Sequence, residues 1–335
     1  MKLLIVKTSS MGDVVHALPM ASDLRRMRPQ AQIDWLVEPA FAALPSLHRD
    51  VARVHTLAWR RWRRQLFKRP TWQAMGELDH ALRSSRYDLV IDAQGLLKSA
   101  WWARRAQAPV VGYDRHSIRE PLASCLYSHA CAVSRGLHAV ARCRLLAAAA
   151  LRAVDGADAS GAAAGDHGPP DFGLDQVAPY RHQVLTDAYA VLIPNASRPE
   201  KHWPEAHWQG LGRHLQAQGL NPVVLWGSGD EQAMATRIAQ GCGAWVPPFL
   251  TVQEATALLA GSRLVVGLDT GFSHVAAALG KPVVGIYCDH EPGLTGITGS
   301  GPGASLGGKG QQPAFGEVLA AVQQVALETG LHRPP

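Results

Sequence analysis

Two aspartates follow apolar runs of the kind that form buried strands, and both could act on a substrate. Asp13 comes after the run 2–7, and Asp269 ends the run that begins at residue 264. Small residues surround each acid and helix-forming sequence follows, which is typical of a strand–loop–helix turn. In α/β proteins, ligand-binding side chains lie at the carboxyl ends of parallel strands. The pattern predicts two active-site edges, carried by two sheets that face one cleft.

Asp13 is the candidate general base. A carboxylate of ordinary pKa cannot take the proton of an alcohol outright, but it can do so late in a displacement, as the attacked oxygen becomes acidic. We expect burial to raise the pKa of Asp13 and so to strengthen it as a base. The alternative role for Asp13 is to cap the helix that follows it.

The loop at the second aspartate is suited to an anion. Asp269, Thr270 and Gly271 open a predicted helix, whose free amides and positive dipole end attract phosphate. Gly271 permits close approach of the backbone, and Thr270 adds a hydroxyl donor. His274 lies near the same helix start, either in the site or as a neutral, packed side chain. Asp269 itself would repel phosphate, so we assign it to sugar hydroxyls or to fixing the loop.

A cationic run stands in the first part of the chain. It comprises Arg60, Arg61, Arg63, Arg64, Lys68 and Arg69, with Trp59, Trp62, Phe67 and Trp72 interleaved. Four uses are open: a solvated helix face with inward tryptophans, a patch for phosphorylated or carboxylated partners, a nucleic-acid site, or a surface for anionic lipid.

The composition is that of a globular protein long enough for two domains. The chain has 335 residues, is 47% hydrophobic and 18% charged, and carries a formal charge of +6. No apolar run approaches the roughly 20 residues that a membrane span needs, and no cleavable apolar leader precedes the first strand. The five cysteines form no close pair, which favours neither a zinc site nor disulfides. We therefore expect a cytoplasmic location.

Strands and helices alternate along both halves of the chain. The expected strands are 2–7, 32–38, 88–93 and 110–113 in the first half, and 189–194, 222–226, 263–268 and 282–287 in the second. Helices lie between them, one of them opened by a capping box at Thr251 and Glu254. The alternation predicts an α/β fold with parallel sheets covered by helices.

Composition also divides the chain into domains. Residues 156–170 lack periodicity and end in two prolines, as expected of a linker. The predicted domains are 1–170, which includes the linker 156–170, and 171–314. The glycine-rich segment 293–310 is expected to be a loop. Residues 315–335 should form a helix that could dock on either domain, including back on the first.

Five motifs, in order along the chain, resemble glycosyltransferase family nine. They are residues 6–19, 92–99, 119–124, 201–204 and 269–274. The resemblance implies a GT-B fold, in which two Rossmann-like domains with parallel sheets face a central cleft. The acceptor then lies on the first domain and the nucleotide-sugar on the second.

The resemblance also implies a reaction. It is the inverting transfer of L-glycero-D-manno-heptose from ADP-heptose to the Kdo region of Kdo2-lipid A, in lipopolysaccharide inner-core biosynthesis. ADP-heptose is the donor substrate, and no cofactor is implied. The expected partners are ADP-heptose, Kdo2-lipid A and the cytoplasmic face of the inner membrane, with peripheral association and no nucleic acid.

Matched position by position, the resemblance implies roles for individual residues. Asp13 falls on the catalytic aspartate, Lys201 on a phosphate-binding lysine, and Glu231 on the residue that contacts the ribose. Without the resemblance, Glu231 is equally an exposed acid in the first turn of a helix. The implied donor site comprises Ser197, Lys201, Glu231, Asp269, Thr270, Gly271 and His274. The implied acceptor site comprises Arg60, Arg61, Arg63, Arg64, Lys98 and Arg119.

The chain departs from the family pattern at two places. Ser197 keeps the hydroxyl of a family threonine, but Ala196 replaces another hydroxyl residue. The segment 287–294 also differs from the usual family sequence. These departures affect hydrogen bonds to the donor rather than the reaction.

Other classes of protein fit the residues less well. No Asp-x-Asp motif and no His/Cys cluster with ligand spacing occurs, so we expect metal independence. A dinucleotide oxidoreductase would need Gly-x-Gly-x-x-Gly after the first strand, where this chain has Lys7-Thr-Ser-Ser-Met-Gly12. A non-catalytic binder of anionic lipid would explain the cationic run but leave Asp13 and Lys201 without purpose. Within the family, a related transferase with a different acceptor is the alternative.

Overall fold

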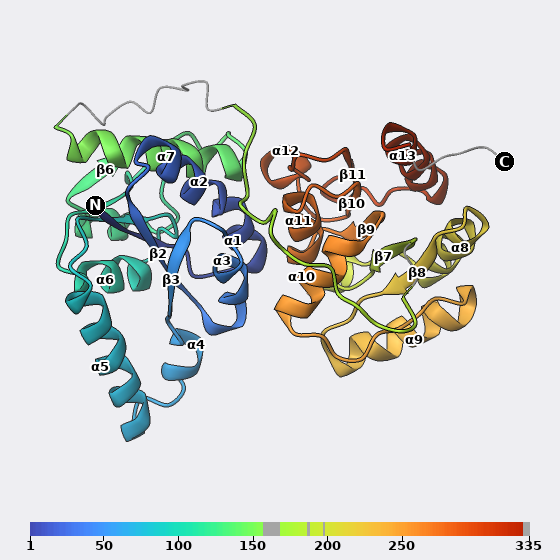
Figure 1. Cartoon of the computed structure of the whole chain (residues 1–335), viewed down its shortest axis with the longest axis horizontal. Coiled ribbons are helices and arrows are strands. Elements are labelled where there is room, and N and C mark those ends of the chain that lie inside the picture. Colours follow the sequence, from blue (N-terminus) through green and yellow to red (C-terminus); the bar gives the residue numbers. More distant parts are fainter. Residues whose placement is uncertain (157–167, 186–187, 197, 331–335) are drawn as a thin grey trace. The chain divides into compact units, whose positions relative to one another are not determined.

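The chain forms two compact units, Met1–Gly173 and Leu174–Pro335, and each has its own sheet (Figure 1). The computed structural model describes residues 1–156, 168–185, 188–196 and 198–330. Most of the predicted linker, 156–170, lies outside these residues.

The first unit is built on a six-stranded sheet in the order β3-β2-β1-β4-β5-β6, and each neighbouring pair is parallel. The strands are β1 (Lys2–Val6), β2 (Gln32–Val37), β3 (Val51–Thr56), β4 (Leu89–Asp92), β5 (Val110–Tyr113) and β6 (His129–Cys131). The helices are α1 (Met11–Ala17), α2 (Pro19–Met27), α3 (Ala43–Ser46), α4 (Trp59–Trp62), α5 (Arg69–Ser84), α6 (Leu97–Arg105) and α7 (Ala139–Val154), with short 3-10 turns at Pro39–Phe41 and Pro121–Leu126. This strand order is that of a Rossmann-like sheet, whose direction of winding reverses between β1 and β4. The loops after β1 and β4 therefore flank the point where such sheets bind ligands.

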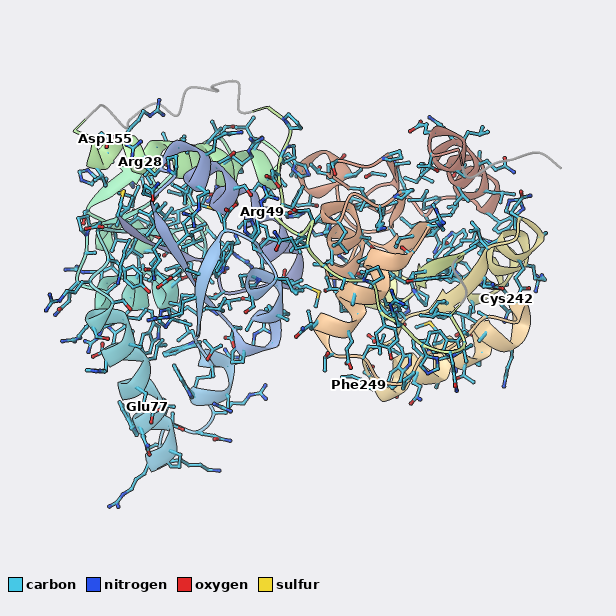
Figure 2. All side chains as sticks on the ribbon, in the orientation of Figure 1. Arg28, Arg49, Glu77, Asp155, Cys242 and Phe249 are labelled. Atoms are coloured by element: carbon cyan, nitrogen blue, oxygen red, sulfur yellow. The ribbon has the colours of Figure 1, made fainter. Side chains whose placement is uncertain are left out.

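Apolar strands and an ion-paired helix hold the first unit together. Strands β1 and β4 are apolar and almost wholly buried, as expected where helices cover both faces. Helix α7 packs on α1 and α2. The buried Arg144 of α7 donates to both carboxylate oxygens of Asp23 on α2, over 2.7 and 3.1 Å. A second pair, Arg28 with Asp155, joins the ends of the same helices (Figure 2). These contacts fix α1, and with it the loop after β1.

The second unit is built on a five-stranded parallel sheet in the order β11-β10-β9-β7-β8. The strands are β7 (Tyr189–Ile193), β8 (Asn221–Val224), β9 (Leu264–Leu268), β10 (Val283–Tyr287) and β11 (Gly303–Gly307). The helices are α8 (Glu205–Ala217), α9 (Gly229–Cys242), α10 (Val252–Gly261), α11 (Gly271–Ala278), α12 (Pro292–Thr295) and α13 (Phe315–Glu328), with a 3-10 turn at Pro199–Lys201. The winding reverses between β7 and β9, so the loops after these two strands flank the second ligand-binding edge.

The last helix belongs to the second unit. Helix α13 packs on β10 and β11. Its apolar face, with Val318, Val322 and Val325, is buried in the same core as Trp203 and Val284. The sequence left open on which domain this segment docks; the helix packs on the second unit, because its apolar side chains complete the core of the sheet that precedes it.

The predicted α/β class and all eight predicted strands are confirmed. The capping box of α10 is also present, because Glu254 N donates to Thr251 Oγ1 over 3.3 Å and Thr251 N donates to Glu254 Oε2 over 2.8 Å. The expected loop 293–310 instead contains most of α12 and the edge strand β11. Strands β3 and β6 were not predicted. Among the helices of the described residues, none combines the length and apolar character that crossing a bilayer requires.

Candidate functional site

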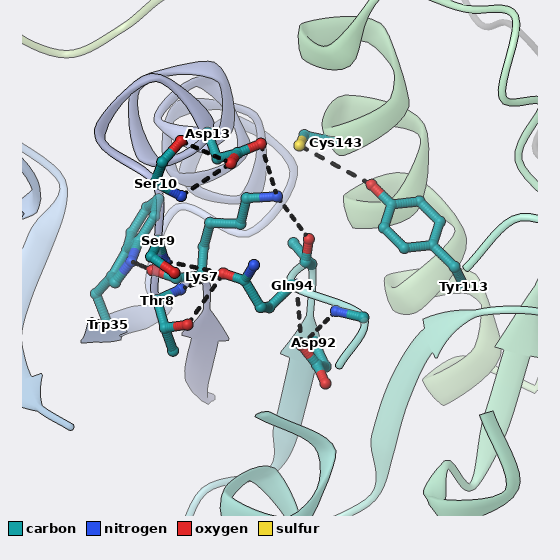
Figure 3. A network of polar contacts seen from close by, with 12 residues as sticks. Lys7, Thr8, Ser9, Ser10, Asp13, Trp35, Asp92, Gln94, Tyr113 and Cys143 are labelled. Carbon is teal, nitrogen blue, oxygen red and sulfur yellow. Dashed lines mark hydrogen bonds and ion pairs between the residues drawn. The ribbon is translucent and has the colours of Figure 1, made fainter. Parts of the chain in front are cut away.

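Asp13 stands in the first turn of α1, at the carboxyl end of β1, and its two oxygens have different surroundings (Figure 3). The backbone N and Oγ of Ser10 donate to Oδ2 over 2.8 and 2.9 Å. The other oxygen, Oδ1, lies 3.8 Å from the Lys7 ammonium, and the side chain is 41% exposed. One oxygen therefore caps the helix while the other faces a cation and remains open to a substrate.

The electrostatics of Asp13 differ from the prediction. Burial raises the pKa of Asp13, but the Lys7 ammonium, the two Ser10 donors and the Arg119 guanidinium together outweigh it, so the pKa lies below its ordinary value. The expectation of a raised pKa is wrong, because these cations and donors stabilise the charged form. Asp13 is consequently ionised at neutral pH and can accept a proton only as the attacking oxygen becomes acidic.

A buried network holds the Asp13 loop in place (Figure 3). Gln94 Oε1 accepts from Thr8 N and Ser9 N, over 2.7 and 2.9 Å. The buried Asp92 in turn accepts from Gln94 N over 2.9 Å and from Tyr127 over 2.9 Å. Burial raises the pKa of Asp92, although these donors oppose the shift. The loop after β4 thus orients the loop after β1. The second motif, 92–99, contains Asp92 and Gln94, but its sequence did not reveal that they position the Asp13 loop.

Lys7 was not among the predicted site residues. Its Nζ donates to the Ala93 carbonyl over 2.9 Å and lies beside Asp13. The signal in the sequence is its place at the end of the first strand, between an apolar run and the acid.

Removal of the Lys7 charge should move the pH profile. Because Lys7 holds the pKa of Asp13 low, the Lys7→Met variant should have a higher Asp13 pKa. The base must be ionised, so activity is lost as pH falls through this pKa, and the acid limb should move to higher pH in the variant. The measurement is kcat/KM against pH for both proteins at saturating donor. Lys7→Arg, which keeps the charge, should stay close to wild type, and an unmoved acid limb in Lys7→Met would refute the coupling.

Asp13 opens onto a strongly cationic cavity within the first unit, with a volume of about 370 Å³. Its charged and polar lining is made by Lys7, Asp13, His16, Gln94, Tyr113, Ser117, Arg119, Arg135 and Arg142. Arg142 is held in place by a 2.7 Å bond to the Ser117 carbonyl and by the Tyr113 ring, 4.9 Å from its guanidinium. The structure therefore brings the predicted Arg119 to Asp13 and adds Arg135 and Arg142. A cavity of this kind suits a substrate with carboxylate groups.

A second hollow of about 480 Å³ gathers three of the predicted acceptor residues. Arg60, Arg63 and Lys98 line it together with Trp59, Leu96, Leu97 and Glu120. Burial and the two guanidinium groups lower the pKa of Lys98, against the opposing charges of Glu38 and Glu120. A bound anion would reduce the repulsion between these cations, so the hollow suits phosphate. Arg61 and Arg64 are exposed and line neither hollow.

In the second unit, an ion-paired lysine lies at the switch point between β7 and β9. Lys201 Nζ donates to Asp269 Oδ2 over 2.7 Å, and His274 Nε2 lies 3.5 Å from Oδ1. Both Lys201 and Asp269 are 12% exposed. Burial raises the pKa of Asp269, but His274 and Lys201 lower it far more, so its net pKa is well below the usual range. Asp269 therefore holds the Lys201 ammonium in place.

The start of α11 is built for an anion. Thr270 is the N-cap residue and Gly271 begins the helix. Thr270 Oγ1 is buried, and it has no hydrogen-bond partner within the part of the chain that the structure describes. A buried hydroxyl without a partner is costly, so a ligand oxygen is the expected partner. The helix amides point to the same place.

The remaining predicted donor residues have different outcomes. Glu231 lies in the first turn of α9, where its Oε2 accepts from Gly227 N over 2.7 Å. This bond engages one oxygen of the Glu231 carboxylate. Ser197 lies outside the described residues. Among the described residues, no group of three or more His, Cys, Asp or Glu side chains is arranged to hold a metal ion.

Comparison with known proteins places the chain in a family. Residues 75–319 match the model of glycosyltransferase family 9 (heptosyltransferase). The chain is 42% identical to lipopolysaccharide heptosyltransferase 1 of Pseudomonas aeruginosa, over 89% of this chain and 82% of the relative. It is similar to the structure of Escherichia coli heptosyltransferase WaaC with ADP, at 36% identity and TM-score 0.86, over 97% and 100% of the two chains. The WaaC structure with ADP-2-deoxy-2-fluoro heptose gives 36% identity and TM-score 0.83, over 98% and 100%.

These matches cover nearly the whole chain, and the predicted GT-B fold is confirmed. The chain belongs to glycosyltransferase family 9, the heptosyltransferase family.

Proposed function

We propose that this protein transfers L-glycero-D-manno-heptose from ADP-heptose to the Kdo region of Kdo2-lipid A, with inversion, in lipopolysaccharide inner-core biosynthesis. The proposal rests on the geometry of Asp13. One carboxylate oxygen accepts hydrogen bonds from Ser10, and the other faces the Lys7 ammonium in a cavity lined by cations. The relatives named lipopolysaccharide heptosyltransferase 1 support it.

The second unit supplies the donor site. Lys201, Thr270 Oγ1 and the first amides of α11 lie at one sheet edge and suit the diphosphate of ADP-heptose. Glu231 Oε1 suits a ribose hydroxyl. Solved relatives bind ADP and ADP-2-deoxy-2-fluoro heptose, which supports this assignment.

The mechanism is a single displacement. An acceptor hydroxyl attacks the anomeric carbon of heptose, the carbon–oxygen bond to ADP breaks, and Asp13 Oδ1 takes the hydroxyl proton as the new bond forms. The electron pair of the broken bond leaves with ADP, whose charge Lys201 and the α11 amides stabilise. Lys7 holds Asp13 ionised and cannot itself serve as the base while it is protonated.

The first unit supplies the acceptor site. Arg119, Arg135 and Arg142 would bind Kdo carboxylates beside Asp13, since guanidinium groups bind carboxylates bidentately. Arg60, Arg63 and Lys98 would bind a lipid A phosphate in the second hollow. Because such an acceptor is held by its acyl chains in a bilayer, we assign the protein a peripheral place on the cytoplasmic face of the inner membrane.

The test is incubation with ADP-heptose and a Kdo2-lipid A analogue, with released ADP and product mass as the readouts. One heptose added for each ADP released, in the inverted configuration, supports the proposal. ADP release without heptosylated Kdo would refute the acceptor. Turnover with another saccharide acceptor instead would indicate a related transferase of the same family.

Turnover should be independent of divalent metal. The charge that a cation would neutralise is met by Lys201 and the helix amides, and the described residues hold no metal-ligand cluster. Excess EDTA, followed by dialysis, should leave kcat within about twofold of the untreated value. An enzyme that used a metal ion as a Lewis acid would lose far more, because such an ion commonly stabilises the transition state by several kcal/mol. A near-complete loss that magnesium restores would contradict this prediction.

A further inference from the structure

An apolar tip stands between α4 and α5, and we define it by Leu66, Phe67 and Trp72. Phe67 is fully exposed, Trp72 is 59% exposed and Leu66 is 40% exposed. Phe67 is also the most exposed large apolar side chain in the part of the chain that the structure describes. Large apolar groups gathered in water mark a surface that contacts another molecule or a membrane.

Hydrogen bonds and ring packing tie the tip to the rest of the first unit. Trp72 Nε1 donates to the Leu66 carbonyl over 2.6 Å, and Lys68 N donates to the Gln65 carbonyl over 3.0 Å. On the inner side, Trp62 of α4 is buried against Trp102, with ring centroids 5.7 Å apart.

The tip is also raised above its surroundings. Figure 1 shows the start of α5 projecting beyond the rest of the first unit. Glu77 lies farther along the same projecting helix (Figure 2). The apolar side chains stand at the free end, before the first acid of this helix.

The stretch of chain that carries the tip is rich in cations and has no acid. Residues 51–76 contain no Asp or Glu, and the cations nearest the tip in sequence are Arg63, Arg64, Lys68 and Arg69. All four are exposed. In the described structure Arg64, Lys68 and Arg69 form no ion pair. Aromatic and aliphatic side chains ringed by Lys and Arg suit the boundary between acyl chains and anionic headgroups.

Other occupants fit less well. In a symmetric contact with a second copy, the cations would face each other and repel. Nucleic acid would use the cations and could stack on an aromatic ring, but it would leave the aliphatic Leu66 in water. An anionic bilayer satisfies both the apolar and the charged groups.

We propose that Leu66, Phe67 and Trp72 form a wedge that inserts at the headgroup–acyl boundary of an anionic bilayer, while the flanking cations bind lipid phosphates. The proposal rests on the proposed function in one respect, that the acceptor is carried by a membrane. Arg60 and Arg63 line the second hollow and directly precede the wedge in the chain. Insertion would therefore hold this hollow at the level of the headgroups.

Vesicle binding tests the wedge without using the reaction. The full chain is sedimented with vesicles of phosphatidylcholine and phosphatidylglycerol. Phe67→Ser should lower the partition coefficient of the protein from water into the vesicles about tenfold or more. The reason is that the variant loses the free energy gained when the Phe67 ring is transferred from water into the bilayer. Leu66→Ser should have a smaller effect. Leu327→Ser is the matched control, because Leu327 is an exposed leucine on α13, and it should bind as wild type does. Equal binding by Phe67→Ser and wild type would overturn the proposal.

Two further readouts distinguish insertion of the wedge from adsorption of the cations alone. Brominated lipid should quench the tryptophan fluorescence of the wild type more strongly than that of Trp72→Phe. Equal quenching of the two proteins would show that Trp72 stays outside the bilayer, which would contradict insertion of the wedge. Phe67→Ser should keep wild-type kcat/KM on an acceptor stripped of its acyl chains and lose it on the vesicle-embedded acceptor. An equal loss on both acceptors would overturn the wedge. Absence of turnover by the wild type on either acceptor would refute the proposed function, while the vesicle experiment would still decide on the wedge.

Discussion

Asp13→Asn should lower kcat by about 10²–10⁴-fold, the usual contribution of general-base catalysis, and leave the affinity for ADP-heptose near that of the wild type. The amide keeps the size of the side chain and an oxygen that can accept from Ser10, so the start of α1 is preserved. Only the ability to take a proton is lost. Single-turnover rates and donor titration by calorimetry measure the two effects separately.

Ser10→Ala is the matched control, because Asp13 both caps the helix and faces the cavity. This variant removes one donor to Oδ2 and keeps the carboxylate. It should reduce the free energy of unfolding by about 1 kcal/mol, as cap substitutions do, while kcat stays within a few fold. If Asp13→Asn retained turnover, or if Ser10→Ala lost as much as Asp13→Asn, the carboxylate would be a structural cap and not the base.

Lys201→Met should weaken donor binding and lower kcat/KM by about 10²–10³-fold, the loss seen when one preorganised electrostatic group is removed. The cation faces both Asp269 and the end of the sheet where the diphosphate is expected. The variant should also be less stable, by about 3 kcal/mol, because Asp269 then keeps a buried charge without the ammonium that pairs with it.

A double variant separates these two roles of Lys201. In Lys201→Met/Asp269→Asn, the uncompensated carboxylate is gone, so much of the stability should return. The donor affinity should not return, since the phosphates still lack their cation. Thermal unfolding and ADP titration of the single and double variants are the measurements. Recovery of donor affinity in the double variant would mean that Lys201 acts only as a structural ion pair.

The sequence predicted the buried strands because they are apolar on both faces. Strands β1, β4, β7, β9 and β10 are continuous apolar runs and were located correctly. Strand β3 was missed because it is largely exposed, so its sequence lacks that signal. Strand β11 is an edge strand that contains two glycines, and glycine-rich sequence favours a loop. Only pairing with β10 makes it a strand.

The candidate site was predicted in outline. Asp13 and Asp269 were singled out because each follows an apolar run, whereas the role of Lys201 came from the resemblance to glycosyltransferase family nine. The direction of the Asp13 pKa shift could not be predicted, because it depends on Lys7, Ser10 and Arg119 acting together. Arg135 and Arg142 were missed for a similar reason: they reach the cavity from segments far along the chain from Asp13 and carry no local motif.

Helix α13 has a practical consequence for the design of fragments. Its valines fill the face of the second sheet next to Trp203, whose indole nitrogen donates to the Pro313 carbonyl over 2.9 Å. A shortened recombinant protein meant for inhibitor screening against the proposed donor site must retain residues 313–328. A protein that ended at β11 would expose the apolar face of the second sheet to solvent, and we expect it to aggregate before any compound could be tested.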